Sequence, residues 1–353
     1  MNFDTLIRTM PIWQNGADDE DGIVISSRAR LARNIRDKPF ATKISEVERD
    51  AVIEQVLAAA KSSSQMENST FYSMSTLDGN DRRVLVERHL ISPALADGNG
   101  QRGVLFNEEE SLSVMINEED HLRLQAIFPG ISASSAWREV NALDDELSFS
   151  LPYSYSNELG FLTACPTNTG TGLRVSVFMH LPGLVLTEDM ERVVQGLSQL
   201  SLTVRGVYGE GSNPAGNLFQ VSNQSTLGSS EEKIVEELLR VVGQIVAYER
   251  NARETLLEGA RSQTEDKVWR AYGLLSNARV LSSQEFMNLL SAVRLGYGVG
   301  LIRDVTPKFL NQLMVITQPS HMQAAAGRPL EADERDFRRA EMVRNKFSDS
   351  VTG

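Results

Sequence analysis

Five arginines in this sequence have the residue type and the positions to bind an anion that carries several phosphate groups. Each stands beside or inside a run that predicts a β-strand: Arg28, Arg30, Arg123, Arg174 and Arg205. Guanidinium groups offer planar, charge-assisted hydrogen bonds to phosphate oxygens, so several that converge would hold a polyphosphate. Taken singly, each is more typical of a surface or salt-bridged arginine. Only their joint placement near strand ends favours an anion site.

Three of these arginines carry a further expectation. Arg28 and Arg30 come two residues apart directly after the strand-like run 23–25, so they project to one face if that strand continues. Arg205 stands between Val204 and Gly206 inside an apolar strand, where a charge is costly to bury without a negative partner.

Two acidic segments could supply carboxylates to such a site. The segment NEEDH at 117–121 includes Glu119 and follows a hydrophobic run, and Glu210 stands between glycines in YGEG. A carboxylate there would orient and deprotonate a cationic nucleophile, and the glycines would let the loop close over a substrate. Taken alone, the first segment is more typical of a solvated acidic turn.

The remaining reactive side chains give weaker signals. Cys165 is the only cysteine, which excludes an intramolecular disulfide, and lone cysteines are most often buried packing residues. No Cys/His spacing for zinc surrounds it, so we expect no protein metal site. His89 and His121 are more typical of structural histidines. The glycine motif at 98–103 precedes a strand and opens no helix, which indicates a loop and not a dinucleotide site.

Composition limits the function classes. The 353 residues are 41% hydrophobic and 23% charged, as in ordinary globular proteins, and no apolar run is long enough for a membrane span. The start of the chain lacks a secretory signal, and a single cysteine is typical of a reducing compartment, so we expect a cytoplasmic protein. A net charge of −12 argues against general nucleic-acid binding and suits a cationic partner, although acidity also simply aids solubility.

The pattern of elements predicts an α+β fold with a largely antiparallel sheet. Residues 1–20 read as a tail or short helix, and a helix starts at Ser45, where Glu48 completes a capping box. Strands are expected at 84–86, at 103–107 with 111–116 as a hairpin, and in the runs from Leu173, Leu202 and Leu218, with a helix near 190–197.

After Gly228 the sequence shows only helical periods. Ser229 with Glu232 predicts one helix start, Ser282 with Glu285 a second, and Thr306 before Pro307 a third. The helical C-terminal region therefore begins between 230 and 265.

Five segments, in order and with the right spacing, resemble the phosphagen (guanidino) kinase family and, within it, the bacterial kinases that act on arginine in proteins. They are SSRARLARN (26–34), NEEDHLR (117–123), CPTNTGTGLR (165–174), RGVYGEG (205–211) and VSNQSTLG (221–228). The resemblance implies the family's antiparallel sheet flanked by helices, ATP as phosphoryl donor and Mg²⁺ as its companion ion.

The resemblance also implies roles for single residues. The five arginines would clamp the ATP phosphates, and His89 would lie near the adenine. Glu119 would be the catalytic base, Glu210 a second guanidinium-binding carboxylate on a mobile loop, and Cys165 a residue that positions the guanidinium.

Two departures select the branch of the family. Only about 25 residues precede the first motif, where small-molecule phosphagen kinases carry a helical domain, and about 100 helical residues follow the catalytic block. We expect a catalytic domain at 21–255 and a helical domain at 256–353. The latter contains RDFRRA at 335–340, and the resemblance implies that Arg335, Asp336 and Arg339 bind phosphoarginine as an allosteric site. Without it, this i,i+4 arginine pair reads as a surface salt-bridge cluster.

The sequence thus predicts a protein-arginine kinase. By resemblance, phosphorylation of arginine by this kinase would direct proteins to Clp-type degradation and inactivate a heat-shock repressor in a stress response. The chain would form a homodimer and have an activator protein as a partner. Two alternatives stay open: a kinase for free arginine, and a phosphoarginine-binding adaptor in which catalysis is incidental.

Overall fold

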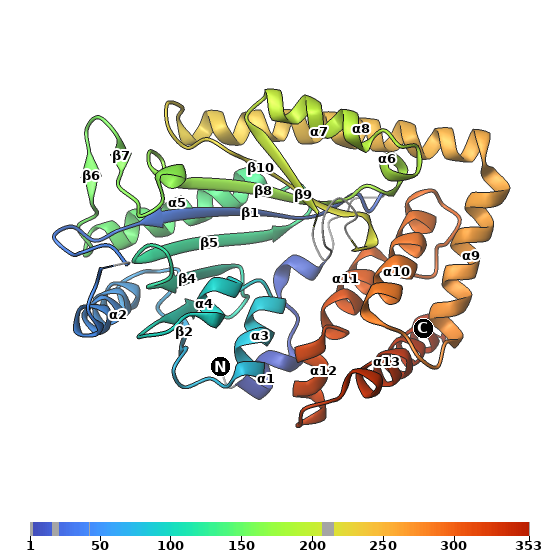
Figure 1. The fold of residues 1–353 in the computed structure, drawn as a ribbon, viewed down its shortest axis with the longest axis horizontal. Coiled ribbons are helices and arrows are strands. Elements are labelled where there is room, and N and C mark those ends of the chain that lie inside the picture. Colours follow the sequence, from blue (N-terminus) through green and yellow to red (C-terminus); the bar gives the residue numbers. More distant parts are fainter. Residues whose placement is uncertain (1–2, 16–20, 42, 207–214, 353) are drawn as a thin grey trace.

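The structure is a computed structural model that describes residues 3–15, 21–41, 43–206 and 215–352. It contains one large sheet, helices on both of its faces, and a C-terminal group of helices (Figure 1). Glu210 lies outside the described residues. Among the helices that are described, none has both the length and the apolar character needed to cross a membrane.

The eight-stranded sheet is antiparallel throughout its registered pairs, in the order β2-β3-β4-β5-β1-β8-β10-β9. Its strands are β1 (Val24–Arg33), β2 (Thr70–Ser73), β3 (Gly103–Phe106), β4 (Leu112–Ile116), β5 (Leu122–Pro129), β8 (Leu173–His180), β9 (Leu202–Gly206) and β10 (Leu218–Asn223). A separate small hairpin pairs β6 (Tyr155–Ser156) with β7 (Gly160–Phe161).

One face of the sheet is apolar and is covered by helices. Alternate residues of the central strands, such as Ala29, Leu31 and Val175, lie in a buried cluster with the inner stripes of these helices. The covering helices are α2 (Glu46–Lys61), α5 (Ala133–Ser148), α6 (Pro182–Leu186), α7 (Met190–Gln199) and α8 (Glu231–Gly259). Burial of this face fixes the register, because a one-residue slip would turn its apolar residues to the other side.

The C-terminal helices form a second core against the opposite face. They are α9 (Arg261–Asn277), α10 (Ser283–Gly298), α11 (Pro307–Ile316), α12 (Pro319–Ala326) and α13 (Ala332–Thr352). Their core includes Ile127 of β5, Phe178 of β8 and Trp13 of the short 3-10 helix η1 (Ile12–Asn15). The C-terminal region therefore packs directly onto one end of the sheet. The 29 residues of α8 run across the expected boundary at 255–256, which stays a prediction.

Several sequence predictions are confirmed. The fold is α+β, Ser45 and Glu48 form the capping box of α2, and β3 with β4 is the expected hairpin. Ser282 and Thr306 cap α10 and α11 as predicted. The first 20 residues include a short helix, α1 (Phe3–Arg8).

Two predictions of elements are wrong. The apolar run 84–86 is not a strand but part of helix α3 (Gly79–Glu87), which Asp78 caps by accepting the N–H of Asp81. Three apolar residues show no period of their own, and the cap decides the structure. The cap of α8 is Ser230 and not Ser229, because its side chain accepts the N–H of Lys233. After α3, the short helix α4 (Pro93–Asp97) leads to β3.

A buried ion pair fixes the end of β1 to α5. Arg33 donates from Nε to Asp144 at 2.9 Å and from its terminal nitrogen at 2.7 Å, and both side chains are almost inaccessible. Arg33 also donates to the carbonyls of Ala32 and Thr171 and lies over the Phe161 ring. Each of the three guanidinium nitrogens therefore donates to at least one acceptor, and such hydrogen bonds are the condition for a buried pair to be tolerated.

The first prediction concerns this pair. Asp144→Asn is expected to lower the free energy of unfolding by about 3 kcal/mol, because it removes the nearest counter-charge of the buried Arg33 and leaves Glu231 at 3.9 Å. Asp145→Asn, at the exposed neighbouring position, should change it by no more than about 0.5 kcal/mol. Urea denaturation of both variants measures the difference. Equal effects would show that the ion pair contributes nothing specific.

Candidate active site

Arg28 and Arg30 lie inside β1, not after it, because the strand continues to Arg33. Side chains alternate along a strand, so both project to the face opposite Ala29. Arg30 stands directly opposite Arg174 of β8. Since residues directly opposite each other in an antiparallel pair share a face, the three arginines lie on the same side of the sheet.

Arg123 and Arg205 share this side through the register of the neighbouring strands. Arg123 of β5 pairs with Ala32, which is in phase with Arg30. Arg205 of β9 pairs with Gln220 of β10, whose side-chain oxygen accepts a hydrogen bond from Arg28 at 3.0 Å. We call this side of the sheet, with its five arginines, the arginine face.

Arg205 differs from the sequence expectation in one respect. It lies exposed on the edge strand β9, so the expected cost of burying its charge does not arise. It is the most accessible member of the arginine face and the one nearest in sequence to the segment that holds Glu210.

The arginine face has a surplus of positive charge. The pKa of Arg30 is lowered well below its ordinary value, first by burial and then by repulsion from Arg28, Arg123 and Arg174. Burial and repulsion from Arg205 and Arg123 also lower the pKa of Arg174. Within the described part of the chain, the Nε groups of Arg30 and Arg174 are buried without a hydrogen-bond partner. Such donors fit an anion with several acceptor oxygens.

Glu118 is the carboxylate that the structure places on the arginine face. It accepts from Arg123 at 2.7 Å and from the Ser92 hydroxyl at 2.6 Å. Burial alone would raise the pKa of Glu118, but Arg123 and Ser92 outweigh it, and the pKa lies below its ordinary value. The sequence reading missed this residue. The five-residue spacing to Arg123 across a tight β4–β5 turn is the signal that could have found it.

Glu119 points away from its neighbour and toward the cysteine loop. It is exposed, and its Oε2 accepts from Asn168 at 3.4 Å. Asn168 belongs to the short 3-10 helix η2 (Pro166–Asn168), which begins directly after Cys165. The thiol of Cys165 lies 3.0 Å from the hydroxyl of Thr167. The structure therefore brings the predicted base and the predicted cysteine segment together.

Asp120 joins the turn at 117–121 to the segment before Cys165. Its Oδ1 accepts from the backbone N–H of Ala164 at 2.7 Å and from the Asn34 side chain at 2.6 Å. His121, expected to be structural, has its ring Nδ1 bonded to the N–H of Ile35 at 3.0 Å. Sequence reasoning missed Asp120 and Asn34, because a polar residue that acts through backbone bonds leaves no spacing signal.

His89 lies at the border of the arginine face. It takes a left-handed conformation, with φ of 63°, two residues after the end of α3, and its carbonyl accepts from Gln125 at 2.7 Å. Gln125 is the cross-strand partner of Arg30. The His89 ring contacts the Trp13 ring at a centroid distance of 4.9 Å. Burial, together with the charge of Arg28, lowers the pKa of His89 to about 3, so the ring is neutral at physiological pH.

The predicted C-terminal anion residues lie on α13, far along the chain from the arginine face. Arg339 is buried and donates to the carbonyls of Thr317 at 3.1 Å and Leu281 at 2.7 Å, and to Asp336 at 2.6 Å. Arg335 is half-buried and donates to the carbonyl of Leu330 at 2.6 Å. A cavity of about 90 Å³ adjoins Arg339, which is smaller than most ligand pockets.

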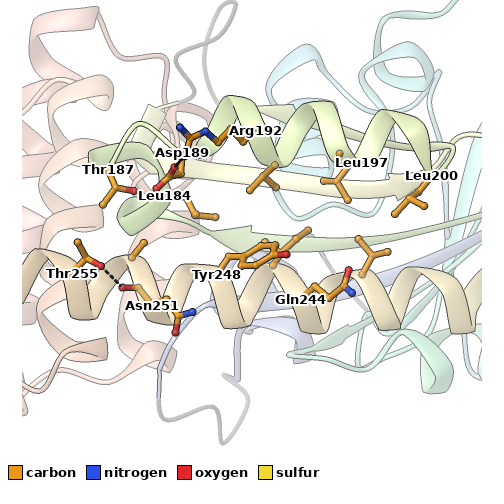
Figure 2. A pocket seen from close by; sticks show the side chains of 15 residues that line it. Leu184, Thr187, Asp189, Arg192, Leu197, Leu200, Gln244, Tyr248, Asn251 and Thr255 are labelled. Atoms are coloured by element: carbon orange, nitrogen blue, oxygen red, sulfur yellow. Dashed lines mark hydrogen bonds and ion pairs between the residues drawn. The ribbon is translucent and has the colours of Figure 1, made fainter.

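A larger apolar cavity, of about 680 Å³, lies between α7 and α8 (Figure 2). Leu197 of α7 and Leu200, directly after this helix, face Tyr248 and Gln244 of α8 across it. Of the residues that the structure describes, none of the five arginines lines this cavity. It belongs to the helical layer over the apolar face and is not a phosphate site.

The described residues hold no group of three or more His, Cys, Asp or Glu side chains that could bind a metal ion by themselves. Mg²⁺ commonly keeps several waters and is held by one or two carboxylates plus substrate phosphates. Glu118 and Glu119, beside the arginine face, fit that mode of binding.

Family models match most of the chain. Residues 51–252 match "ATP:guanido phosphotransferase, C-terminal catalytic domain", and residues 261–352 match "Protein-arginine kinase McsB C-terminal domain". Curated relatives match over nearly the whole length. The protein-arginine kinase of Geobacillus sp. (strain WCH70) is 46% identical over 98% of this chain and 97% of its own. That of Halalkalibacterium halodurans is 47% identical over 95% and 94%.

Solved structures agree in fold. Lombricine kinase is similar with a TM-score of 0.58 and 25% identity, over 73% of this chain and 78% of its own. The duplicated taurocyamine kinase from Schistosoma mansoni, solved with transition-state-analogue components, gives a TM-score of 0.60. It is 23% identical over 69% of this chain and 35% of its own, which supports the fold alone.

The second prediction uses the surplus charge of the arginine face. Arg30→Met should lower the affinity for ATP about tenfold or more, the loss expected for one charged hydrogen-bond donor. It should leave the stability of the ligand-free protein unchanged or raise it, because a repelled buried charge is removed.

Calorimetric titration with ATP and thermal unfolding without it measure the two effects. Arg192→Met is the control, since that exposed side chain pairs only with Asp189 among the described residues. A large loss of stability in Arg30→Met without ligand would contradict the prediction.

Proposed function

We propose a division of roles among these side chains, from the premise that the chain belongs to the ATP:guanido phosphotransferase family and, within it, to the protein-arginine kinases. The protein is therefore a kinase that phosphorylates arginine side chains in proteins. Which residue does what is our proposal. The observation that supports it best is the gathering of five arginines on one sheet face beside the Glu119 turn.

The arginine face holds the phosphates of ATP. Arg28, Arg30 and Arg174 come from the two central strands, β1 and β8. Arg123 comes from β5 beside β1, and Arg205 from the edge strand β9, which β10 separates from β8. Phosphoryl transfer passes through a loose transition state, so catalysis rests on in-line positioning and on balancing negative charge. Guanidiniums that repel one another without a ligand gain most from the phosphates, because the anion relieves their mutual repulsion. Glu118 and Glu119 would help to hold Mg²⁺, which would neutralise part of the phosphate charge.

His89 takes the base of the nucleotide at the edge of this face. Its ring is neutral, so it offers an uncharged aromatic surface and one nitrogen donor or acceptor to an adenine. The Trp13 ring packs against the His89 ring, and Gln125 donates a hydrogen bond to the His89 carbonyl.

The acceptor arginine binds on the side of Glu119 and Cys165. A guanidinium is protonated in water and is a poor nucleophile until it loses a proton. Glu119 accepts that proton from the attacking nitrogen while the N–P bond forms and the bond from the γ-phosphorus to the ADP oxygen breaks. Glu210, on the segment after β9, is the second carboxylate for the cation, and the Cys165 thiol contacts the guanidinium. Glu118 serves Arg123 instead.

Arg335, Asp336 and Arg339 form a second, regulatory anion site for phosphoarginine. Arg339 already carries a carboxylate partner in Asp336, so a phosphoryl group would compete with Asp336 for the same donors. The small cavity beside Arg339 would have to widen for this. Occupancy would therefore couple to a movement of α13 relative to Thr317 and Leu281.

The biological setting is a further proposal. The kinase acts in the cytoplasm as a homodimer with an activator protein. The phosphorylated arginines direct proteins to Clp-type degradation, and phosphorylation inactivates a heat-shock repressor. Free arginine is a poorer substrate than arginine in proteins. A role as a phosphoarginine-binding adaptor would require that loss of Glu119 leave cellular function intact.

The third prediction tests the catalytic roles. Incubated with ATP, Mg²⁺ and an unfolded protein, the wild-type chain should form an acid-labile phosphoramidate, and free arginine should turn over more slowly. Glu119→Gln should reduce kcat at least about a hundredfold, the usual contribution of a general base. Glu108→Gln, at an exposed turn position, is the matched control. A Glu119→Gln variant with near-normal kcat would remove Glu119 from the mechanism.

The fourth prediction concerns the regulatory site. Phosphoarginine should bind the wild-type chain in calorimetry, and Arg335→Ala should weaken that binding about tenfold through loss of one charged donor. Arg338→Ala is the control, because Arg338 pairs with Glu334 on the same helix. Arg339 is less suitable as a test, since its removal would leave two buried carbonyls without their donor. Equal binding by both variants would exclude this site.

A further inference from the structure

Glu87, the last residue of α3, caps a helix of the C-terminal region. Its two carboxylate oxygens accept the backbone N–H groups of Ser320 at 2.8 Å and His321 at 2.9 Å. The Nδ1 of His321 donates to the same carboxylate at 2.7 Å. Ser320 and His321 lie in the first turn of α12, where backbone N–H groups have no partner within the helix. A residue 233 positions away in the sequence thus completes α12.

A second set of bonds joins the same two helices. Asn80, near the start of α3, donates to the carbonyl of Ser320 at 3.2 Å and accepts from Gln323 at 3.0 Å. The side chains of Glu87 and His321 are 13% and 3% exposed, so solvent screens their interaction little. Together these bonds hold α3 and α12 as one unit, which we call the α3–α12 clamp.

The clamp ends at the nucleotide side of the arginine face. The next residue after Glu87 is Arg88, which forms a buried ion pair with Glu110 and donates to the carbonyl of Thr9. His89 follows it. The N–H of Leu90 bonds back to the carbonyl of Leu85, so the end of α3 fixes the left-handed turn at His89. A shift or rotation of α3 would therefore move the His89 ring.

The other end of the clamp reaches the C-terminal anion residues. α12 begins two residues after Thr317, whose carbonyl accepts from Arg339 at 3.1 Å. Trp13 gives a parallel contact, because it lies in the C-terminal core and its ring touches His89. The position of the C-terminal helices and the position of His89 are thus joined by continuous contacts.

We propose that Glu87 is a positioning residue through which the C-terminal helices set the place of His89 and, with it, the affinity for the nucleotide. The inference rests on the proposed contact of His89 with the base of ATP. It assigns to Glu87 no contact with substrate. The only competing role is a structural one, in which Glu87 stabilises α12 and nothing more.

The experiment compares Glu87→Gln with the wild-type chain. Glutamine keeps the size of the side chain but turns one acceptor into a donor that faces the N–H groups of α12. The Kd for ATP, measured by calorimetry, and the KM for ATP should both rise about tenfold, within the usual range for coupling between sites. The KM for the protein substrate and kcat should stay within about twofold.

Glu249→Gln is the matched control. Glu249 is also a buried carboxylate that caps a helix: it accepts the N–H groups of Gly183 and Leu184 and pairs with Arg253. It lies on α8, and among the described residues its hydrogen bonds join it to α6 and to its own helix, not to α3 or α12. It should lower the melting temperature as much as Glu87→Gln does, or more, without changing the Kd for ATP.

A second pair of variants keeps the test valid if Glu87→Gln unfolds. His321→Asn retains a side-chain donor near the position of Nδ1, whereas His321→Leu removes it. The Kd for ATP should rise in the leucine variant and return toward the wild-type value in the asparagine variant. Equal Kd values in all variants, with only their stability changed, would overturn the inference. Failure of the wild-type chain to bind ATP would overturn the proposed function itself.

Discussion

Mutual repulsion among the arginines of one sheet face is the constraint on which the rest of the structure depends. Burial, and then repulsion from the three guanidiniums of Arg28, Arg123 and Arg174, lowers the pKa of Arg30 strongly, and Glu118 pairs with Arg123. Such a face is stable only because the other side of the sheet buries a large apolar core beneath α5 and α8. The acidic surplus of the whole chain, −12, therefore lies elsewhere and leaves the anion site locally basic.

Each face of the sheet contributes residues to a different hydrophobic core, and this explains how the C-terminal helices come to lie beside the site. Ile127 and Phe178 extend from the arginine face into the C-terminal core, where Trp13 joins them. The helices consequently border the site and are not attached to it by a linker. Their contacts with α3 run through the Glu87 carboxylate and end beside His89. A structural element far from the phosphates thereby constrains the nucleotide end of the face.

Much of the site was predictable from sequence, because it depends on local order along strands. The alternation of Arg28 and Arg30 follows directly from a continuous β1, and the ordered motifs gave the family and fold. The register that adds Arg174 and Arg205 depends on strand order, which no local pattern contains. Glu118, Gln125 and Glu87 were missed for the same reason, since their partners lie in other elements. The error at 84–86 arose because three apolar residues fit a strand or a helix equally well.

Two adjacent carboxylates show why position, and not residue type, decides a role. Glu118 is buried against Arg123 and Ser92, so it stays ionised and is held on the arginine face. Glu119, one residue later, is exposed and turned toward Asn168 on the cysteine segment. The reversal of side-chain direction follows from the tight turn that Asn117 opens with a φ of 59°. The turn thereby gives the Arg123 ion pair and the proposed proton removal one carboxylate each.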